Sequence, residues 1–335
     1  MTTTAEAVTV TSAGNVELTF AKAREWQLDT AKDLHVSAVA SLAASSGLVL
    51  PIRWNQGCDG ASNSCELVNA YDGTISVIES SPAVVRIATS YRNRQWSEPP
   101  ESGCVTGVDY VIYPSGRVVG HVHIDDIGDW VSLAVFGIVS PSNAFTAVGT
   151  MPDRSFAFAT TDGTSIIAHE PDNDVLATPW VDSLRRGFDL AHVLDKDNAS
   201  PTAFDRVFEL MIDQGQGRSP AERVSDARGV LLRQVSGANP VGSGYDRTLG
   251  AYVVKARAED VAVTVAGSSN DIALVLEDFD ATKWQIDRNG TVLATSDVPI
   301  ADGIVTSYSA ETRRLAIVLT PAAAGDVDLR IRALH

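Results

Sequence analysis

Hydrophobic and polar residues alternate with a period of two along most of the chain, in short runs that turn-forming residues separate. This period is typical of β-strands, because successive side chains of a strand point to opposite faces of a sheet. The runs are rich in β-branched and aromatic residues, as in AVTVTS, NVELTF, GLVLPIRW, TISVIES, AVVRIATSY, VDYVIY and RVVGHVHI. The pattern predicts an all-β protein with a large antiparallel β-sandwich over residues 1–238.

The alternation weakens before residue 240, where we expect one or two short helices. Ser219 is a suitable N-cap, Pro220 fits the first helical position and Glu222 completes a capping box. These residues predict a helical segment near 219–234, followed by a linker over 236–246. Short strands resume after the linker, with a hairpin turn at Asn289-Gly290, and predict a smaller β-sandwich over residues 245–335.

The run YVIYPSGRVVGHVHIDD, residues 110–126, predicts a β-hairpin with a three-residue loop and Gly116 in the left-handed conformation. In this hairpin Tyr113 faces Arg117, and Asp109 faces His121. The apolar parity of the second strand, residues 118 to 124, fits the buried side of the sandwich. The opposite face collects the polar and ionisable side chains, which are Asp109, Tyr113, Arg117, His121, His123 and Asp125.

An earlier strand adds cations to this picture. In VVRIATSYRNRQW, the residues Arg86, Arg92 and Arg94 fall on one parity, and Trp96 follows closely. Guanidinium groups bind carboxylates with two parallel hydrogen bonds, and aromatic rings suit the apolar faces of sugars. If both strand regions lie in one sheet, this face predicts a groove that binds an acidic, uronate-containing polysaccharide.

Composition and charge narrow the classes of partner. The chain has 335 residues, of which 44% are hydrophobic and 20% are charged, which is typical of a globular protein. Its net charge of −16 argues against nucleic acid as a partner. We expect no membrane insertion, because no apolar run approaches the roughly 20 residues that a membrane helix needs. An extracellular location is favoured, although MTTTAEAVTV lacks the features of a signal peptide. The oligomeric state does not follow from the sequence.

Two motifs resemble the galactose-mutarotase-like β-supersandwich domains of polysaccharide lyases and some glycosidases. These domains often contain a "GPVR" element and a "Y-x-Y-P-x-G-R" hairpin, and the chain reads SPAVVR at 81–86 and YVIYPSGR at 110–117. The resemblance covers about residues 75–125 and implies a supersandwich fold for the large domain. The chain has no long helical region of the kind that accompanies this sandwich in many such lyases.

In a lyase, the polar face would carry out β-elimination. Arg86, Arg92 or Arg117 would neutralise the sugar carboxylate, His121 or His123 would remove the neighbouring proton, and Tyr113 would protonate the leaving oxygen. The remaining predicted contacts to the substrate come from Arg94, Asp109 and Trp96. The alternatives are that the face is merely solvated, or that the protein is a non-catalytic sugar-binding module or a viral or secreted structural adhesin.

The His-x-His pattern also suggests a metal site. Two imidazoles at positions i and i+2 of a strand lie on one face, close enough to share one ion, with Asp125 or Asp109 as a third ligand. The other hypotheses require no cofactor. The candidate metal ions are zinc at the two histidines and calcium at the acidic loops 172–174 and 195–198.

The three cysteines leave one question open. Cys58 and Cys65 flank the turn-rich DGASNS, which a disulfide between them would close, and Cys104 would then be left over. The spacing is a poor zinc signature, because no histidine lies nearby. The sequence does not decide between a disulfide and free thiols.

Overall fold

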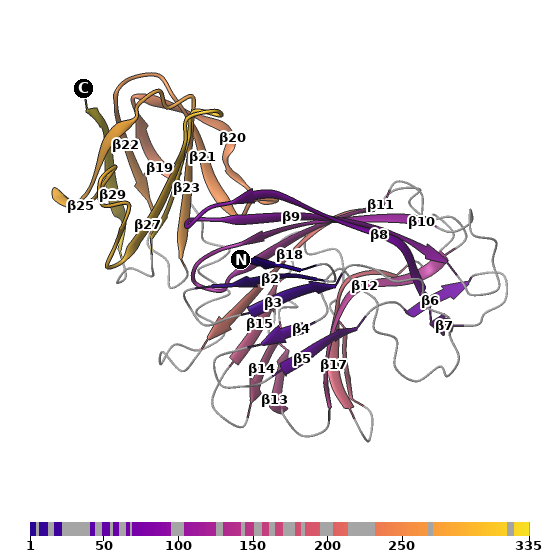
Figure 1. Cartoon of the computed structure of the whole chain (residues 1–335). Helices are drawn as coiled ribbons and strands as arrows, with labels where there is room; N and C mark the ends of the chain where they lie inside the picture. Colours follow the sequence, from indigo (N-terminus) through magenta and orange to yellow (C-terminus); the bar gives the residue numbers. More distant parts are fainter. Residues whose placement is uncertain are drawn as a thin grey trace. The chain divides into compact units, whose positions relative to one another are not determined.

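The fold is known from a computed structural model, shown in Figure 1. The structure describes residues 1–4, 7–12, 17–21, 41–43, 49–53, 56–59, 65–67, 69–94, 104–124, 130–141, 145–150, 156–160, 165–169, 178–181, 185–194, 204–213, 232–266, 271–319 and 325–334. Strands form all the regular elements of this part of the chain, and no helix occurs in it. The predicted all-β class is therefore confirmed. Within the same residues, no helix is long and apolar enough to cross a membrane.

The chain divides into two compact units. The larger unit comprises Met1–Glu79, Arg86–Ile112 and Val118–Gln216, and the smaller comprises Ser80–Val85, Tyr113–Arg117 and Gly217–His335. Two short segments from the N-terminal half therefore belong to the C-terminal unit, and both are loops between neighbouring strands.

The larger unit contains two antiparallel sheets. The ten-stranded sheet has the order β1-β2-β3-β4-β5-β12-β17-β16, with β6 pairing β12 and β7 pairing β6. Its strands are β1 (Thr2–Thr3), β2 (Ala7–Thr11), β3 (Glu17–Ala21), β4 (Ser41–Ala43), β5 (Val49–Arg53), β6 (Gln56–Asp59), β7 (Cys65–Leu67), β12 (Trp130–Pro141), β16 (Thr178–Val181) and β17 (Arg185–Leu194).

The second sheet of this unit has eight strands in the order β13-β14-β15-β18-β11-β10-β9-β8. Its strands are β8 (Asn69–Ser80), β9 (Val85–Arg94), β10 (Cys104–Ile112), β11 (Val118–Ile124), β13 (Phe145–Thr150), β14 (Phe156–Thr160), β15 (Ser165–His169) and β18 (Phe204–Asp213).

Aromatic side chains join these two sheets into a sandwich. Tyr110 of β10 packs edge-to-face on Phe20 of β3, with ring centroids 5.1 Å apart, and on Phe208 of β18 at 6.4 Å. Gly120 of β11 makes room for the Phe208 ring, since a Cβ there would lie 2.1 Å from Cζ. Burial of large aromatic rings is a main source of sandwich stability. The face of β10 and β11 that carries Tyr110 and Gly120 is thus the core face.

The smaller unit is a second sandwich of two sheets. Their orders are β19-β22-β29-β24-β25 and β20-β21-β23-β28-β27-β26. The strands are β19 (Leu232–Ser236), β20 (Ala238–Asp246), β21 (Ala251–Ala256), β22 (Asp260–Val265), β23 (Ile272–Glu277), β24 (Lys283–Arg288), β25 (Thr291–Thr295), β26 (Ile300–Ala301), β27 (Ile304–Ser309), β28 (Arg314–Leu319) and β29 (Val327–Leu334).

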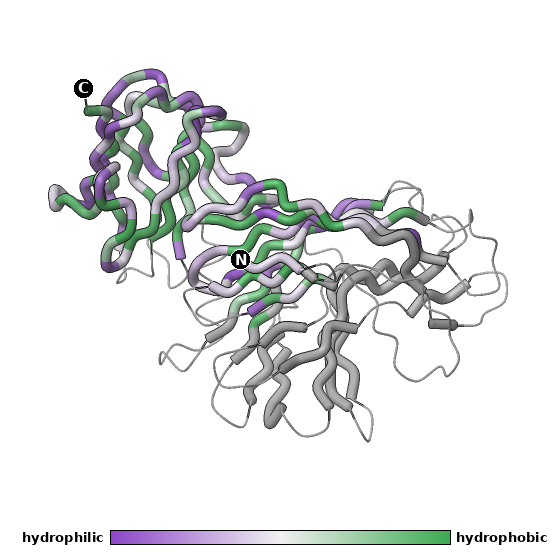
Figure 2. Tube along the Cα trace, in the orientation of Figure 1, coloured by the Kyte–Doolittle hydropathy of each residue, from purple (hydrophilic) through white to green (hydrophobic). Residues whose placement is uncertain are grey.

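Alternation along these strands builds the core of the smaller unit, and Figure 2 shows it as alternating hydrophobic and hydrophilic segments. In β29, Val327, Leu329 and Ile331 are buried, whereas Asp328 and Arg330 between them are exposed. The inward rows of both sheets form one apolar cluster that also contains buried aromatic residues of β24 and the β23–β24 loop. The turn predicted at Asn289-Gly290 is present, with both residues at positive φ.

The region between the sandwiches differs from its prediction. Most of the helix expected near 219–234 lies outside the described residues, and the part from Leu232 onward is strand β19. The linker expected over 236–246 is wrong, because it forms the end of β19 and the strand β20. Gly237, at φ 70°, is the one-residue bend where the chain passes from β19 in one sheet to β20 in the other, and this left-handed conformation favours glycine.

Candidate metal centre

The Pro-Ser-Gly hairpin has the predicted register. The Tyr113 amide donates to the Arg117 carbonyl at 2.9 Å, and the Gly116 amide donates to the Tyr113 carbonyl at 2.9 Å. Gly116 has φ 88°, the left-handed conformation expected of it. In the strands that follow, Asp109 lies opposite His121, and Gly107 lies opposite His123. The turn therefore determines which residues of β10 face the two histidines.

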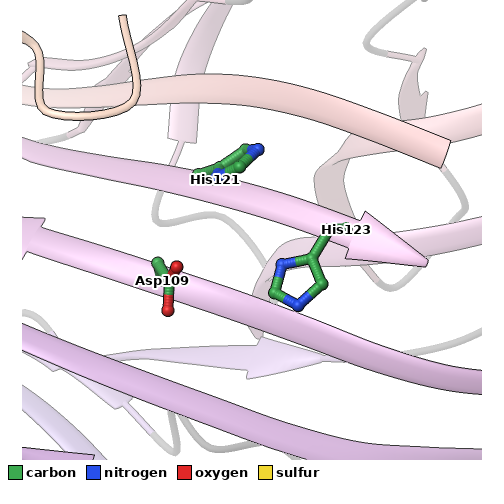
Figure 3. Close-up of side chains that lie close together, drawn as sticks. All are labelled: Asp109, His121 and His123. Atoms are coloured by element: carbon green, nitrogen blue, oxygen red, sulfur yellow. The ribbon is translucent and has the colours of Figure 1, made fainter. Parts of the chain in front are cut away.

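This register brings together Asp109, His121 and His123, which we call the histidine cluster. One ligand atom of each residue lies within 4.8 Å of the others. Figure 3 shows the three side chains on neighbouring strands, with the His123 ring reaching toward the strand that carries Asp109. The two imidazole centroids are 5.9 Å apart. The cluster of one carboxylate and two imidazoles predicted from the sequence is thus present in the structure.

A fourth residue, Asp205 of β18, completes the surroundings of the cluster. Its Oδ1 lies 2.8 Å from Nε2 of His121, and Asp205 stands directly opposite His123 in the strand register. The His121 side chain is 19% exposed, and that of Asp205 is 75% exposed. When Nε2–H donates to this carboxylate, the lone pair of His121 lies on Nδ1, which is the state in which imidazole binds a metal.

The two faces of β11 differ as the alternation predicts. Val118, Gly120, Val122 and Ile124 are all buried against the core, whereas His123 on the other face is exposed. This second face is not solvated along its whole length. Towards the hairpin loop it is buried, with Val119 fully buried and Glu209 of β18 opposite it only 4% exposed. The histidine cluster therefore occupies the open end of a partly covered surface.

Tyr113 and Arg117 do not lie with the histidine cluster. Both are buried, 4% and 6% exposed, and both belong to the smaller unit. Nε of Arg117 donates to Asp271 Oδ1 at 2.7 Å, and the Arg117 guanidinium stacks 4.3 Å from the centroid of the Tyr113 ring. The structure therefore does not bring these two residues together with the predicted catalytic histidines.

The contacts of this hairpin loop account for its burial. The Tyr113 hydroxyl donates to the Leu249 carbonyl at 2.5 Å, and Nη2 of Arg117 donates to the Gly250 carbonyl at 2.8 Å. Ser115 Oγ donates to the second carboxylate oxygen of Asp271 at 2.8 Å. A buried guanidinium and a buried carboxylate are tolerated because each satisfies the other and further polar groups join them. The polar side chains of the loop are thus held by contacts within the smaller unit.

The other predicted contacts are only partly described. Arg86 and Arg92 are half-buried on β9, on the parity opposite the buried Ile87 and Thr89. β9 ends at Arg94, whose side chain lies outside the described part of the structure. The positions of Trp96, Asp125 and the acidic loops 172–174 and 195–198 are also outside the described residues. Their predicted roles stay predictions.

Asp205 is the member of the site that the sequence prediction missed. It lies 84 residues after His121, on β18, in the part of the chain before residue 240 where the sequence predicted one or two short helices. The signal that was available is the alternation in FDRVFELMID, which puts Asp205, Val207 and Glu209 on one parity. Pairing of that strand with β11 could not be inferred from local pattern.

Comparison with known proteins adds no family to this picture. No family model and no curated protein sequence matches the chain. The resemblance to galactose-mutarotase-like domains stays a prediction. The segments Ser80–Val85 and Tyr113–Arg117, which include much of the two motifs that carry it, belong to the smaller unit.

Proposed function

We propose that this protein binds a divalent transition-metal ion at the histidine cluster. The observation that carries the proposal is the convergence of one carboxylate and two imidazoles on adjacent strands, with ligand atoms within 4.8 Å of one another. Ligand atoms around a tetrahedral zinc ion are about 3.4 Å apart, so small rotations of these side chains suffice to bring all three ligand atoms within bonding distance of one ion. His123 is exposed and free of core packing on its outer side, which permits such a rotation.

The donor set favours zinc and its transition-metal neighbours over calcium. Calcium takes six to eight oxygen ligands, whereas imidazole suits zinc, copper and nickel. Asp205 plays the part that an outer carboxylate has at many such sites, since it orients His121 and fixes its tautomer. The net charge of −16 raises the local concentration of cations. Three protein ligands leave a coordination position for a further ligand.

Calorimetric titration of the chelator-treated protein with zinc tests the proposal. We expect one ion per chain, and we expect His123→Ala or Asp109→Asn to weaken binding at least about tenfold because each removes a ligand. Asp205→Asn should weaken binding less, since it removes an orienting group. Cobalt provides a second readout, because its visible absorption reports tetrahedral coordination by nitrogen and oxygen.

Asp302→Asn is the matched control, because Asp302 is an exposed aspartate in the turn before β27, far along the chain from the cluster. It should leave the affinity unchanged. Zinc binding that persists undiminished in both His123→Ala and Asp109→Asn would place the ion elsewhere and overturn the proposal. Binding should also weaken as the solution is acidified, because protons compete with the metal for imidazole and carboxylate.

The second candidate is recognition, or cleavage by β-elimination, of an acidic polysaccharide at the same place. It is supported by the exposure of His123 beside a potential cation, which could neutralise the sugar carboxylate in place of the buried Arg117. His123 would hold the cation in this arrangement, so the base would have to come from outside the histidine cluster. The Tyr113 hydroxyl donates to the Leu249 carbonyl and is not available as the acid. Because the protein and the polysaccharide are both negatively charged, a bound cation would favour binding at this surface.

An absorbance assay with a panel of polyuronates, with zinc and with chelator, separates the outcomes. A rise in ultraviolet absorbance that the chelator abolishes would establish a metal-dependent lyase. Zinc-dependent retention of a polyuronate without absorbance change would establish a sugar-binding module. The absence of both, with zinc binding intact, would remove the polysaccharide candidate and leave the metal site.

A further inference from the structure

The two cysteines that the sequence left unassigned lie opposite each other in a β-hairpin. Strands β6 and β7 pair antiparallel, with the register Gln56↔Leu67, Gly57↔Glu66 and Cys58↔Cys65. We propose that Cys58 and Cys65 form a disulfide across this hairpin. The site is distinct from the histidine cluster, which lies on the other sheet of the same unit.

The backbone register meets the distance that a disulfide requires. Residues directly opposite in an antiparallel pair have Cα atoms about 4.5 Å or about 5.5 Å apart, depending on the hydrogen-bonding position. Disulfides span Cα distances of about 4.4–6.8 Å. Either kind of pair therefore permits the bond. Directly opposed residues also share one face of the sheet, which a one-residue shift of register would prevent.

The third cysteine is placed differently. Cys104 is the first residue of β10, in the eight-stranded sheet, whereas β6 and β7 belong to the ten-stranded sheet. Among the described strands, β7 has three residues and pairs with β6 alone. A strand this short gains little from its own hydrogen bonds. A covalent link at its first residue would keep it paired, and this gives the disulfide a structural role.

Formation of the bond is an oxidation. The two thiols lose two protons and two electrons as the sulfur–sulfur bond forms, and an external disulfide such as oxidised glutathione accepts both and becomes two thiols. The disulfide is therefore expected to form in an oxidising compartment, and the two cysteines are expected to remain free thiols in a reducing one.

Thiol counting in the full-length protein tests the inference. The protein is equilibrated in a glutathione buffer of oxidising poise, denatured without reductant, alkylated and weighed by mass spectrometry. We expect one alkylated cysteine, Cys104, and three after reduction. Cleavage on the N-terminal side of Asp59 separates the two cysteines in the sequence, so the two fragments should stay joined until reductant is added.

Two variants supply the controls. Cys104→Ser should leave no cysteine alkylated without reductant, and Cys65→Ser should raise the count from one to two. Three alkylated cysteines in the oxidised wild-type protein would overturn the inference. A linked fragment that contains Cys104 would overturn it as well, because the register predicts a bond between Cys58 and Cys65.

Discussion

At the scale of single residues, the position of His123 depends on a glycine. A Cβ on Gly107 would lie 2.0 Å from Nε2 and 2.2 Å from Cε1 of His123, far inside any real contact. The imidazole therefore occupies the space directly above the backbone of β10, where only glycine admits it. A glycine inside a strand costs stability through its backbone entropy, and close approach of another group is a common reason to retain one.

Gly107→Ala should move His123 and weaken zinc binding about tenfold or more, while the far-ultraviolet circular dichroism stays that of a β-protein. The reason is that the added methyl group and the ring cannot share the same space. Calorimetric titration measures the loss. The same substitution in a His123→Ala background should have no further effect on affinity, because the displaced ligand is already absent. An equal additional loss there would mean that Gly107 acts independently of His123.

Prediction from sequence succeeded where the determining interactions are local. The loop Pro114-Ser115-Gly116 specified the hairpin and hence the Asp109–His121 pair, since loop length and the left-handed glycine set the register. It failed for the burial of Arg117, whose partner Asp271 is 154 residues away. Alternation assigns a side chain to a face of its own strand, but what covers that face depends on segments that no local pattern identifies.

At the scale of elements, charged pairs cross the outer face of the sheet that contains β22 and β29. Nε of Arg330 donates to both carboxylate oxygens of Asp260, at 2.9 and 3.0 Å. This hydrogen bonding, with the positive charges of Arg330 and Arg332, lowers the pKa of Asp260 below the ordinary aspartate range. Because both side chains are about half exposed, the pair contributes modestly to stability.

The lowered pKa of Asp260 determines how its contribution to the stability of the fold changes with pH. A carboxylate whose folded-state pKa is depressed stabilises the fold above the unfolded-state pKa of about 4, and that contribution is lost as the pH falls through the folded-state value. The difference in urea midpoint between wild type and Asp260→Asn should therefore be present near pH 6 and should shrink as the pH falls below the unfolded-state pKa of about 4. Asp302→Asn serves as the reference, since its midpoint should follow the wild type. A difference that grows on acidification would contradict the assignment.

At the scale of the whole molecule, the smaller unit is assembled from three separate stretches of chain. The Arg117–Asp271 pair joins two of them, and both side chains are almost completely buried. Removal of one member of such a pair leaves the other charge buried without compensation, which is far more costly than the loss of an exposed pair. The integrity of the C-terminal sandwich thus depends on residues that precede it by more than a hundred positions.

Arg117→Ala should lower the free energy of unfolding by about 3–5 kcal/mol, as measured by urea denaturation followed by circular dichroism. Arg233→Ala, which removes an exposed ion pair with Asp326, is the control and should cost at most about 1 kcal/mol. The double variant Arg117→Met with Asp271→Leu should recover much of the loss, because apolar residues of similar size can replace a buried pair. Equal effects of Arg117→Ala and Arg233→Ala would contradict this account.

The separation of Arg117 and Asp271 along the chain determines when this ion pair can form during protein synthesis. A ribosome adds roughly 5–20 residues per second, so on the order of 8–30 s separate the appearance of Arg117 from that of Asp271. During this interval the Arg117 guanidinium cannot form its buried ion pair, because Asp271 has not yet been synthesised. Burial of this loop is therefore completed only after the residues around Asp271, in the last third of the chain, have been synthesised.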